Sequence, residues 1–156
     1  MQTLPEIIIS FWPLFFLVAG GQSIFFSILV LSNKSQNKSN LYLAAFLFLF
    51  GFMLIYNFAY WSNYQYHNSH FYFSNLTLNY LFGPLLLLYL DSLRPEPKLQ
   101  QWAWVHFLPA IIYFLFLSPF YFQNMEAKVL NIMGEVPVPF NKKILFIGYM
   151  LSLIHI

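Results

Sequence analysis

The residues best placed for chemistry in this sequence are four polar side chains in or beside long apolar segments: Asn57, Asn79, Asp91 and His106. Such a group is costly to bury without a partner, so each marks either a functional site or a packing contact. Asn57 and Asn79 lie in neighbouring apolar segments, and a hydrogen bond between their amides would fix helix register and contribute about 0.6–2 kcal/mol. Asp91 and His106 flank one polar joint and predict a pH-sensitive pair, since free histidine titrates at about pH 6.5. A histidine bonded to water or backbone is the alternative.

Other patterns give weaker indications of chemistry. His67 and His70 lie three residues apart in the uncharged joint 62–74, a spacing that suits a metal ion. No carboxylate or cysteine accompanies them, so an aromatic interfacial loop or the lining of a ligand pocket is the alternative. No Ser-His-Asp arrangement, glycine-rich phosphate loop or carboxylate pair stands out. We therefore expect no enzymatic activity, no cofactor and no metal site.

A repeat of small residues predicts a contact between helices. Ala19, Ser23 and Ser27 recur every four residues, and small side chains at this spacing let two helix backbones approach closely. Gln22 lies beside this repeat and could form a hydrogen bond across helices.

Gly83 and Pro84 predict a kink in the segment that contains them. The proline has no N–H, so the carbonyl of Tyr80 loses its helical partner. The kink is either a static bend that helps packing or a hinge that transmits a signal.

The composition determines what surroundings these residues need. Of the 156 residues, 60% are hydrophobic and 8% are charged, whereas soluble domains have about 45–50% apolar and about 25% charged residues. So few charges cannot cover a surface that faces water, which excludes an ordinary soluble enzyme and a disordered chain. The absence of cysteine excludes a disulfide scaffold. The composition therefore predicts an integral membrane protein.

Apolar segments separated by polar joints predict an all-α fold, a polytopic transmembrane helix bundle. A helix rises about 1.5 Å per residue, so about 20 residues cross a hydrocarbon core of about 30 Å. Strands are a poor alternative because the segments do not alternate apolar and polar residues. We predict four full spans and a truncated fifth, at residues 7–31, 41–61, 75–90, 102–122 and 144–150.

The distribution of basic residues predicts a multi-pass protein of the cell membrane with its N-terminus outside. Short cytoplasmic joints carry an excess of Lys and Arg. With this orientation, the basic residues inside are Lys34, Lys38, Arg94 and Lys98, and those outside are Lys128, Lys142 and Lys143. The paired lysines at 142 and 143 argue against it.

The last six residues, 151–156 (LSLIHI), resemble the in-frame translation of a transposon end that is used as a sequencing adapter. A native helix fragment of similar composition is the alternative. We expect a non-native tail here, preceded by one transmembrane region over residues 1–150. Native sequence would then end near Met150, with any output domain beyond it.

Two motifs carry a resemblance to a known family. Residues 83–93 (GPLLLLYLDSL) and 106–109 (HFLP) are similar to the end of span three and the start of span four in AraC/XylS-type membrane-bound transcriptional regulators. Residues 20–22, followed by an apolar run and a Lys/Asn joint, add to the likeness. The resemblance implies a multi-span, often seven-span, region before a cytoplasmic helix-turn-helix domain, which is missing here. Similar regions are also joined to kinases.

These observations predict a signal-input or anchoring module of a membrane-bound regulator. Its partners would be the lipid bilayer and, through its spans, further copies of itself, whereas nucleic acid would be bound only by the absent C-terminal domain. A signal would pass as a shift between two packings of the helices. The alternative is a fragment of a membrane transporter, with Gly83 and Pro84 at a helix break beside the substrate.

Overall fold

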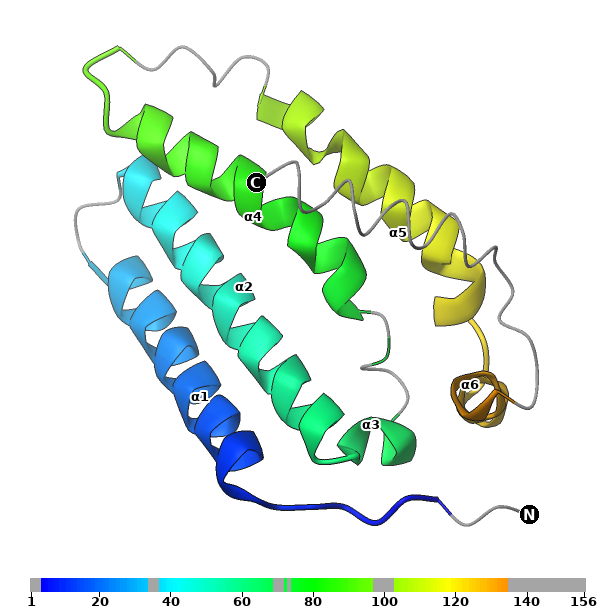
Figure 1. Ribbon diagram of the computed structural model, residues 1–156. Coiled ribbons are helices and arrows are strands. Elements are labelled where there is room, and N and C mark those ends of the chain that lie inside the picture. The colour runs from blue at the N-terminus through cyan, green and yellow to red at the C-terminus, as the bar shows by residue number, and fades with distance from the viewer. Residues whose placement is uncertain (1–3, 34–36, 69–71, 73, 97–102, 135–156) are drawn as a thin grey trace.

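Four long helices lie side by side in the order α1, α2, α4, α5 (Figure 1). The structure is a computed structural model that describes residues 4–33, 37–68, 72, 74–96 and 103–134, and the regular elements within these ranges are all helices. The long helices are α1 (Phe11–Leu31), α2 (Lys38–Trp61), α4 (Ser74–Ser92) and α5 (Leu108–Tyr121). Three short elements complete the described fold: α3 (Tyr64–His67), the 3₁₀ helix η3 (Ala103–Phe107) and α6 (Met125–Met133).

Neighbouring helices of the row run antiparallel. The backbone N–H of Ile8, just before α1, donates to the carbonyl of Ser62 at the end of α2, at 2.9 Å. At the opposite end, the Ser39 hydroxyl at the start of α2 donates to the carbonyl of Ser92 at the end of α4, at 3.2 Å. We call these two places the Ser62 end and the Ser92 end. Helices α1 and α4 begin at the Ser62 end, and α2 and α5 begin at the Ser92 end (Figure 1).

Two glycines bring the backbones of α1 and α2 into contact. A Cβ atom on Gly20 would lie 2.9 Å from the carbonyl oxygen of Gly51, and a Cβ on Gly51 would lie 2.8 Å from the carbonyl oxygen of Gly20. Real Cβ contacts are essentially never this short, so only glycine fits at either position. The contact is the membrane-type packing in which small residues replace interlocking large ones.

Serine hydroxyls extend this contact along α1. Ser23 Oγ donates to the carbonyl of Leu47 and Ser27 Oγ donates to the carbonyl of Ala44, each at 2.7 Å. The predicted contact role of Ser23 and Ser27 is therefore confirmed. Ala19 is half-buried, and the neighbouring Gly20 takes the buried place that the four-residue repeat would give it.

The outer surface of α1 is more apolar than its inner one. Its buried residues are Pro13, Gly20, Ser23 and Ser27. Its exposed residues include Phe11, Trp12, Phe15, Val18, Phe25, Phe26, Ile28 and Leu29. A protein dissolved in water has the opposite arrangement, because burial of large apolar side chains drives its folding. The distribution fits a helix surrounded by lipid.

A second packing centre joins α4 to α5. Its buried side chains are Leu76, Tyr80, Ala110, Tyr113 and Leu117. The rings of Tyr80 and Tyr113 lie 5.1 Å apart between centroids. The Thr77 and Tyr121 hydroxyls are 3.3 Å apart, within hydrogen-bonding distance, so large rings and hydroxyls hold these helices together in place of glycines.

The all-helical expectation holds for the described residues, but fewer spans qualify than the four predicted. Among the described helices, only α1 and α2 are long and apolar enough to cross a membrane. A third span results if α5, taken from Val105, and α6 count as one across a bend of 102°. The 19-residue α4 carries amides near its start and Asp91 near its end, and the 14-residue α5 rises only about 21 Å. The predicted fifth span, 144–150, and the tail 151–156 lie outside the described residues.

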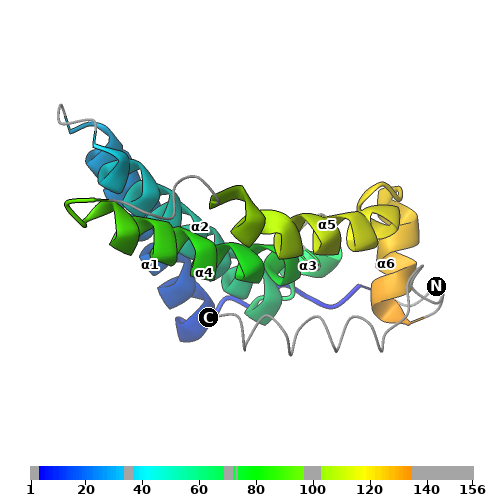
Figure 2. The same ribbon diagram turned by 90° about the horizontal axis from the view of Figure 1, so that it is seen from above.

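Helices also form inside two predicted joints. Asn63 adopts a left-handed conformation (φ 63°), which ends the turn after α2 and starts α3. In the joint 123–143, the Asn124 side chain accepts from the N–H of Ala127 at 3.0 Å and caps α6, and Gly134 (φ 79°) ends it. Seen from above, α6 turns away from the direction of α5 (Figure 2).

We predict that Gly20→Ala lowers the free energy of unfolding in detergent by about 1–3 kcal/mol, because the added methyl group collides with the backbone of α2. Gly21→Ala is the matched control, since a Cβ there meets no atom within 4 Å. Denaturant titration of both variants measures the difference. Equal stability of the two would contradict the tight contact.

Candidate functional site

Several buried polar side chains belong to the elements at the Ser62 end, where α3 follows α2 and α6 follows α5 (Figure 1). Among the described residues, four of the buried polar groups lie there: Ser62, Gln65, Lys128 and Asn131. Their exposed fractions are at most 7%. We call these four residues the polar cluster. Buried polar groups are costly in apolar surroundings, so a concentration of them marks a candidate site.

Lys128 is the charged member of this cluster and is 2% exposed. Its Nζ donates to the carbonyl of Tyr121 at 2.9 Å and lies 5.8 Å from the ring centroid of Phe120. The carbonyl of Tyr121 belongs to the last turn of α5 and has no partner within its own helix, so the ammonium group caps that helix end. Burial lowers the pKa of the Lys128 ammonium group.

Two amide oxygens of the cluster have no hydrogen-bond partner among the residues that the structure describes. They are Oε1 of Gln65, on α3, and Oδ1 of Asn131, on α6. The other half of the Asn131 amide is used, because Nδ2 donates to Oε1 of Gln123 at 2.5 Å. Unpaired buried acceptors are rare in folded proteins, and each can accept from an N–H or O–H donor.

The N-terminal segment and an aromatic pair surround this end. His67 Nε2 lies 2.9 Å from the carbonyl oxygen of Pro5, and Asn63 Nδ2 donates to the carbonyl of Glu6 at 3.1 Å. The ring of Tyr72 lies 6.1 Å from that of Phe120, and burial raises the pKa of its phenol. The joint that was expected to be an interfacial loop or pocket lining thus packs against both the N-terminal segment and α5.

The metal site considered for His67 and His70 gains no support from the described part of the chain. One ring nitrogen of His67 contacts a backbone carbonyl, and His70 lies outside the described residues. Within the described ranges, no group of three or more His, Cys, Asp or Glu side chains could hold a metal ion.

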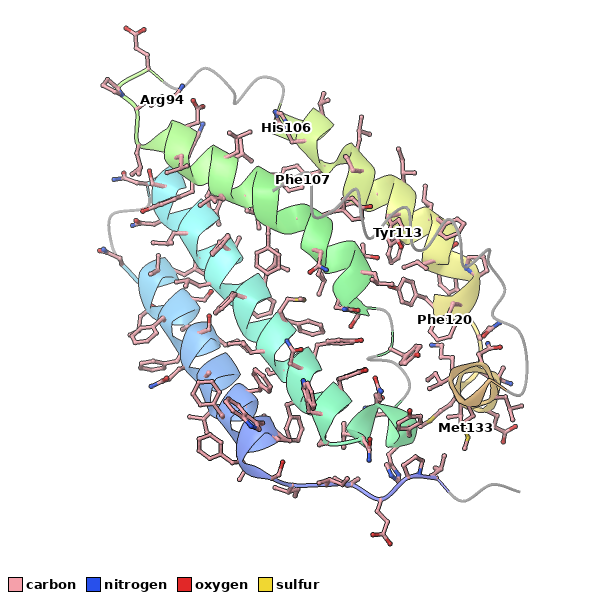
Figure 3. The ribbon with its side chains drawn as sticks, in the orientation of Figure 1. Arg94, His106, Phe107, Tyr113, Phe120 and Met133 are labelled. Atoms are coloured by element: carbon pink, nitrogen blue, oxygen red, sulfur yellow. The ribbon has the colours of Figure 1, made fainter. Side chains whose placement is uncertain are left out.

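The predicted pair of Asp91 and His106 is not formed. Asp91 is 2% exposed, and its Oδ1 lies 3.6 Å from Nη1 of Arg94, one turn further along the chain. No hydrogen bond or ion pair joins it to His106, which is half-buried in η3, just before α5. Figure 3 shows Arg94 and His106 at the same end of the row, opposite Phe120 and Met133. Asp91 and His106 both lie at the Ser92 end, but the local turn brings Arg94 to the carboxylate instead.

The predicted bond between Asn57 and Asn79 is also absent. Nδ2 of Asn57 donates to the carbonyl of Met53 at 3.0 Å, within α2. Both side chains are half-buried, and no hydrogen bond joins them. An asparagine side chain on a helix can donate to the carbonyl four residues back, and this local bond takes the place of the expected one between helices.

Gly83 and Pro84 lie within α4, which continues without interruption from Ser74 to Ser92. Pro84 is buried. A helix break at this position, as the transporter alternative requires, is not seen. The hinge role of the two residues stays a prediction.

Compared with known protein families, curated proteins and solved structures, the chain matches none. The resemblance to membrane-bound regulators therefore depends only on the sequence motifs at 83–93 and 106–109 and on the pattern that begins at residues 20–22.

Sequence reasoning missed the polar cluster. Lys128 was counted only for orientation, and Gln65 and Asn131 were taken as parts of joints. One signal was present: Lys128 and Asn131 are three positions apart, so they share one face of a helix if that segment is helical. The cap at Asn124 and the glycine at 134 bound that helix.

We predict that Lys128→Met lowers the free energy of unfolding by about 1–3 kcal/mol, because the carbonyl of Tyr121 loses a charged donor while the apolar stem is kept. Glu126→Gln, on the exposed face of α6, is the control and should change stability little. Unfolding in detergent, with protease cleavage at residues 122–124 as a second measure, tests this. A stable, protease-resistant Lys128→Met protein would contradict the capping role.

Proposed function

We propose that this chain is the membrane-embedded signal-input or anchoring module of a transcriptional regulator, with the cytoplasmic helix-turn-helix domain beyond it. The observation that supports membrane embedding most directly is α1, where small and polar residues are buried and large apolar ones are exposed. The regulator assignment is supported by the resemblance at 83–93 and 106–109. We also propose that the chain has no enzymatic activity and binds no cofactor or metal.

The proposal includes four full spans, followed by a fifth that begins at residue 144. Helices α1 and α2 qualify by length and composition. The antiparallel order supports crossings by the other two, because α4 and η3–α5 run between the same two ends (Figure 1). The five residues of η3 lead directly into the 14 of α5, which lengthens the fourth crossing.

In the proposed orientation the Ser62 end faces outside and the Ser92 end faces the cytoplasm. The polar cluster, with its two unpaired amide oxygens, would then receive a signal from outside. The Asp91–Arg94 pair would lie on the cytoplasmic side, next to the output domain. Asn57, Asn79 and His106 would contribute to packing, and Gly83–Pro84 would serve as the hinge between the ends.

We predict that Glu96→Cys and Glu126→Cys react with a membrane-impermeant maleimide on opposite sides of the membrane. Both replace an exposed glutamate, and the chain has no other cysteine, so the variants are matched. In intact cells Glu126→Cys should be labelled, and Glu96→Cys only after permeabilisation. If both cysteines are labelled from the same side of the membrane, α5 does not cross the membrane. The reverse pattern would invert the orientation.

The regulator itself is tested by the sequence of the intact gene beyond the codon for residue 150. We expect two further spans and then a basic helix-turn-helix region. A second, related set of spans would instead support the transporter, and a kinase domain would identify another output.

A further inference from the structure

Gln22 is a polar side chain near the middle of the 21-residue α1 that faces away from the rest of the protein. Its side chain is exposed, and its amide makes no hydrogen bond to any residue that the structure describes. The hydrogen bond across helices that the sequence suggested for Gln22 is therefore not formed among the described residues. In the proposed membrane position of α1, this amide would lie at mid-depth in an apolar surrounding.

The exposed position of Gln22 follows from helix geometry. The residues of α1 that pack on α2 are Gly20, Ser23 and Ser27. Val18 and Ser27 are nine positions apart, which is two and a half turns at about 3.6 residues per turn, so they lie on opposite sides of the helix. Gln22 is four positions from Val18 and shares its side. Helix α1 also ends the row, with α2 as its packing neighbour (Figure 1).

The residues around Gln22 repeat with the spacing of a two-helix seam. Five residues of α1 follow one another at alternating spacings of three and four positions: Phe15, Val18, Gln22, Phe25 and Leu29. The four apolar members are between 49% and 64% exposed. We call these five residues the Gln22 face. Paired helices often have an apolar heptad seam with one polar residue at its centre. That polar residue determines the register of the two helices.

We propose that the Gln22 face joins two copies of this chain, with α1 packed in parallel against α1 of the second copy. Two copies inserted in the same orientation are related by an axis along the membrane normal, which brings each Gln22 to the same depth as its counterpart. A glutamine amide is both donor and acceptor, so two of them satisfy each other. A second copy is thus the partner that removes the cost of the amide in lipid. This inference rests on the proposed membrane position of α1.

Cysteine cross-linking tests the pairing directly, because the chain has no cysteine of its own. In membranes that contain the full chain, Gln22→Cys should form a disulfide-linked dimer on oxidation. Two control variants should form several-fold less disulfide-linked dimer. They are Leu17→Cys, at a position that is 40% exposed but off the Gln22 face, and Ser27→Cys, at a position that faces α2.

A second measurement uses energy transfer between labelled copies in lipid bilayers. Gln22→Leu should weaken the dimer about 3- to 30-fold, the loss expected for one interhelical hydrogen bond in a membrane, and Gln22→Asn should preserve it. A chain that stays in the membrane at alkaline pH but shows no excess dimer for Gln22→Cys overturns this inference alone. An unchanged dimer for Gln22→Leu also overturns it. A chain released at alkaline pH overturns both this inference and the proposed function.

Discussion

The backbone contact between Gly20 and Gly51 is the interaction on which the α1–α2 pair depends. In lipid, large apolar side chains gain nothing by leaving the solvent, so helices associate through close packing and hydrogen bonds. The two glycines allow the close approach, and the hydroxyls of Ser23 and Ser27 then reach carbonyls of α2. The large side chains of α1 are consequently displaced to the outside, which produces the inverted distribution of polarity.

The two ends of the row differ in their chemistry. At the Ser92 end, a buried carboxylate is paired with an arginine that is itself largely exposed. At the Ser62 end, a buried ammonium group caps a helix, and two amide oxygens have no partner in the described part of the chain. A protein that responds to its surroundings needs one end that can gain a contact and another whose arrangement can change in response. The proposed direction of signalling follows this asymmetry.

Apolar runs in the sequence located the long helices to within a few residues, since a helix in lipid must satisfy its own backbone and therefore follows the run. The predicted segment 41–61 became Lys38–Trp61, and 75–90 became Ser74–Ser92. The joints were harder to predict. Helix α6 forms inside one of them because an asparagine cap and a final glycine outweigh the polar composition of the segment. Fewer helices than predicted qualify as spans by length and composition, because the third and fourth segments are short or carry polar residues near their ends.

By itself, the sequence determined the helical class, the positions of the long helices and the contact role of Ser23 and Ser27, because these depend on composition and on spacing along one helix. The partners of the polar groups were decided only by the tertiary structure. Asn57 bonds within its own helix, Asp91 meets Arg94, and Lys128 reaches the end of α5. Each of these side chains had several partners within reach along the chain. Only the packing of the helices and the turns between them determined which donor and acceptor came within bonding distance.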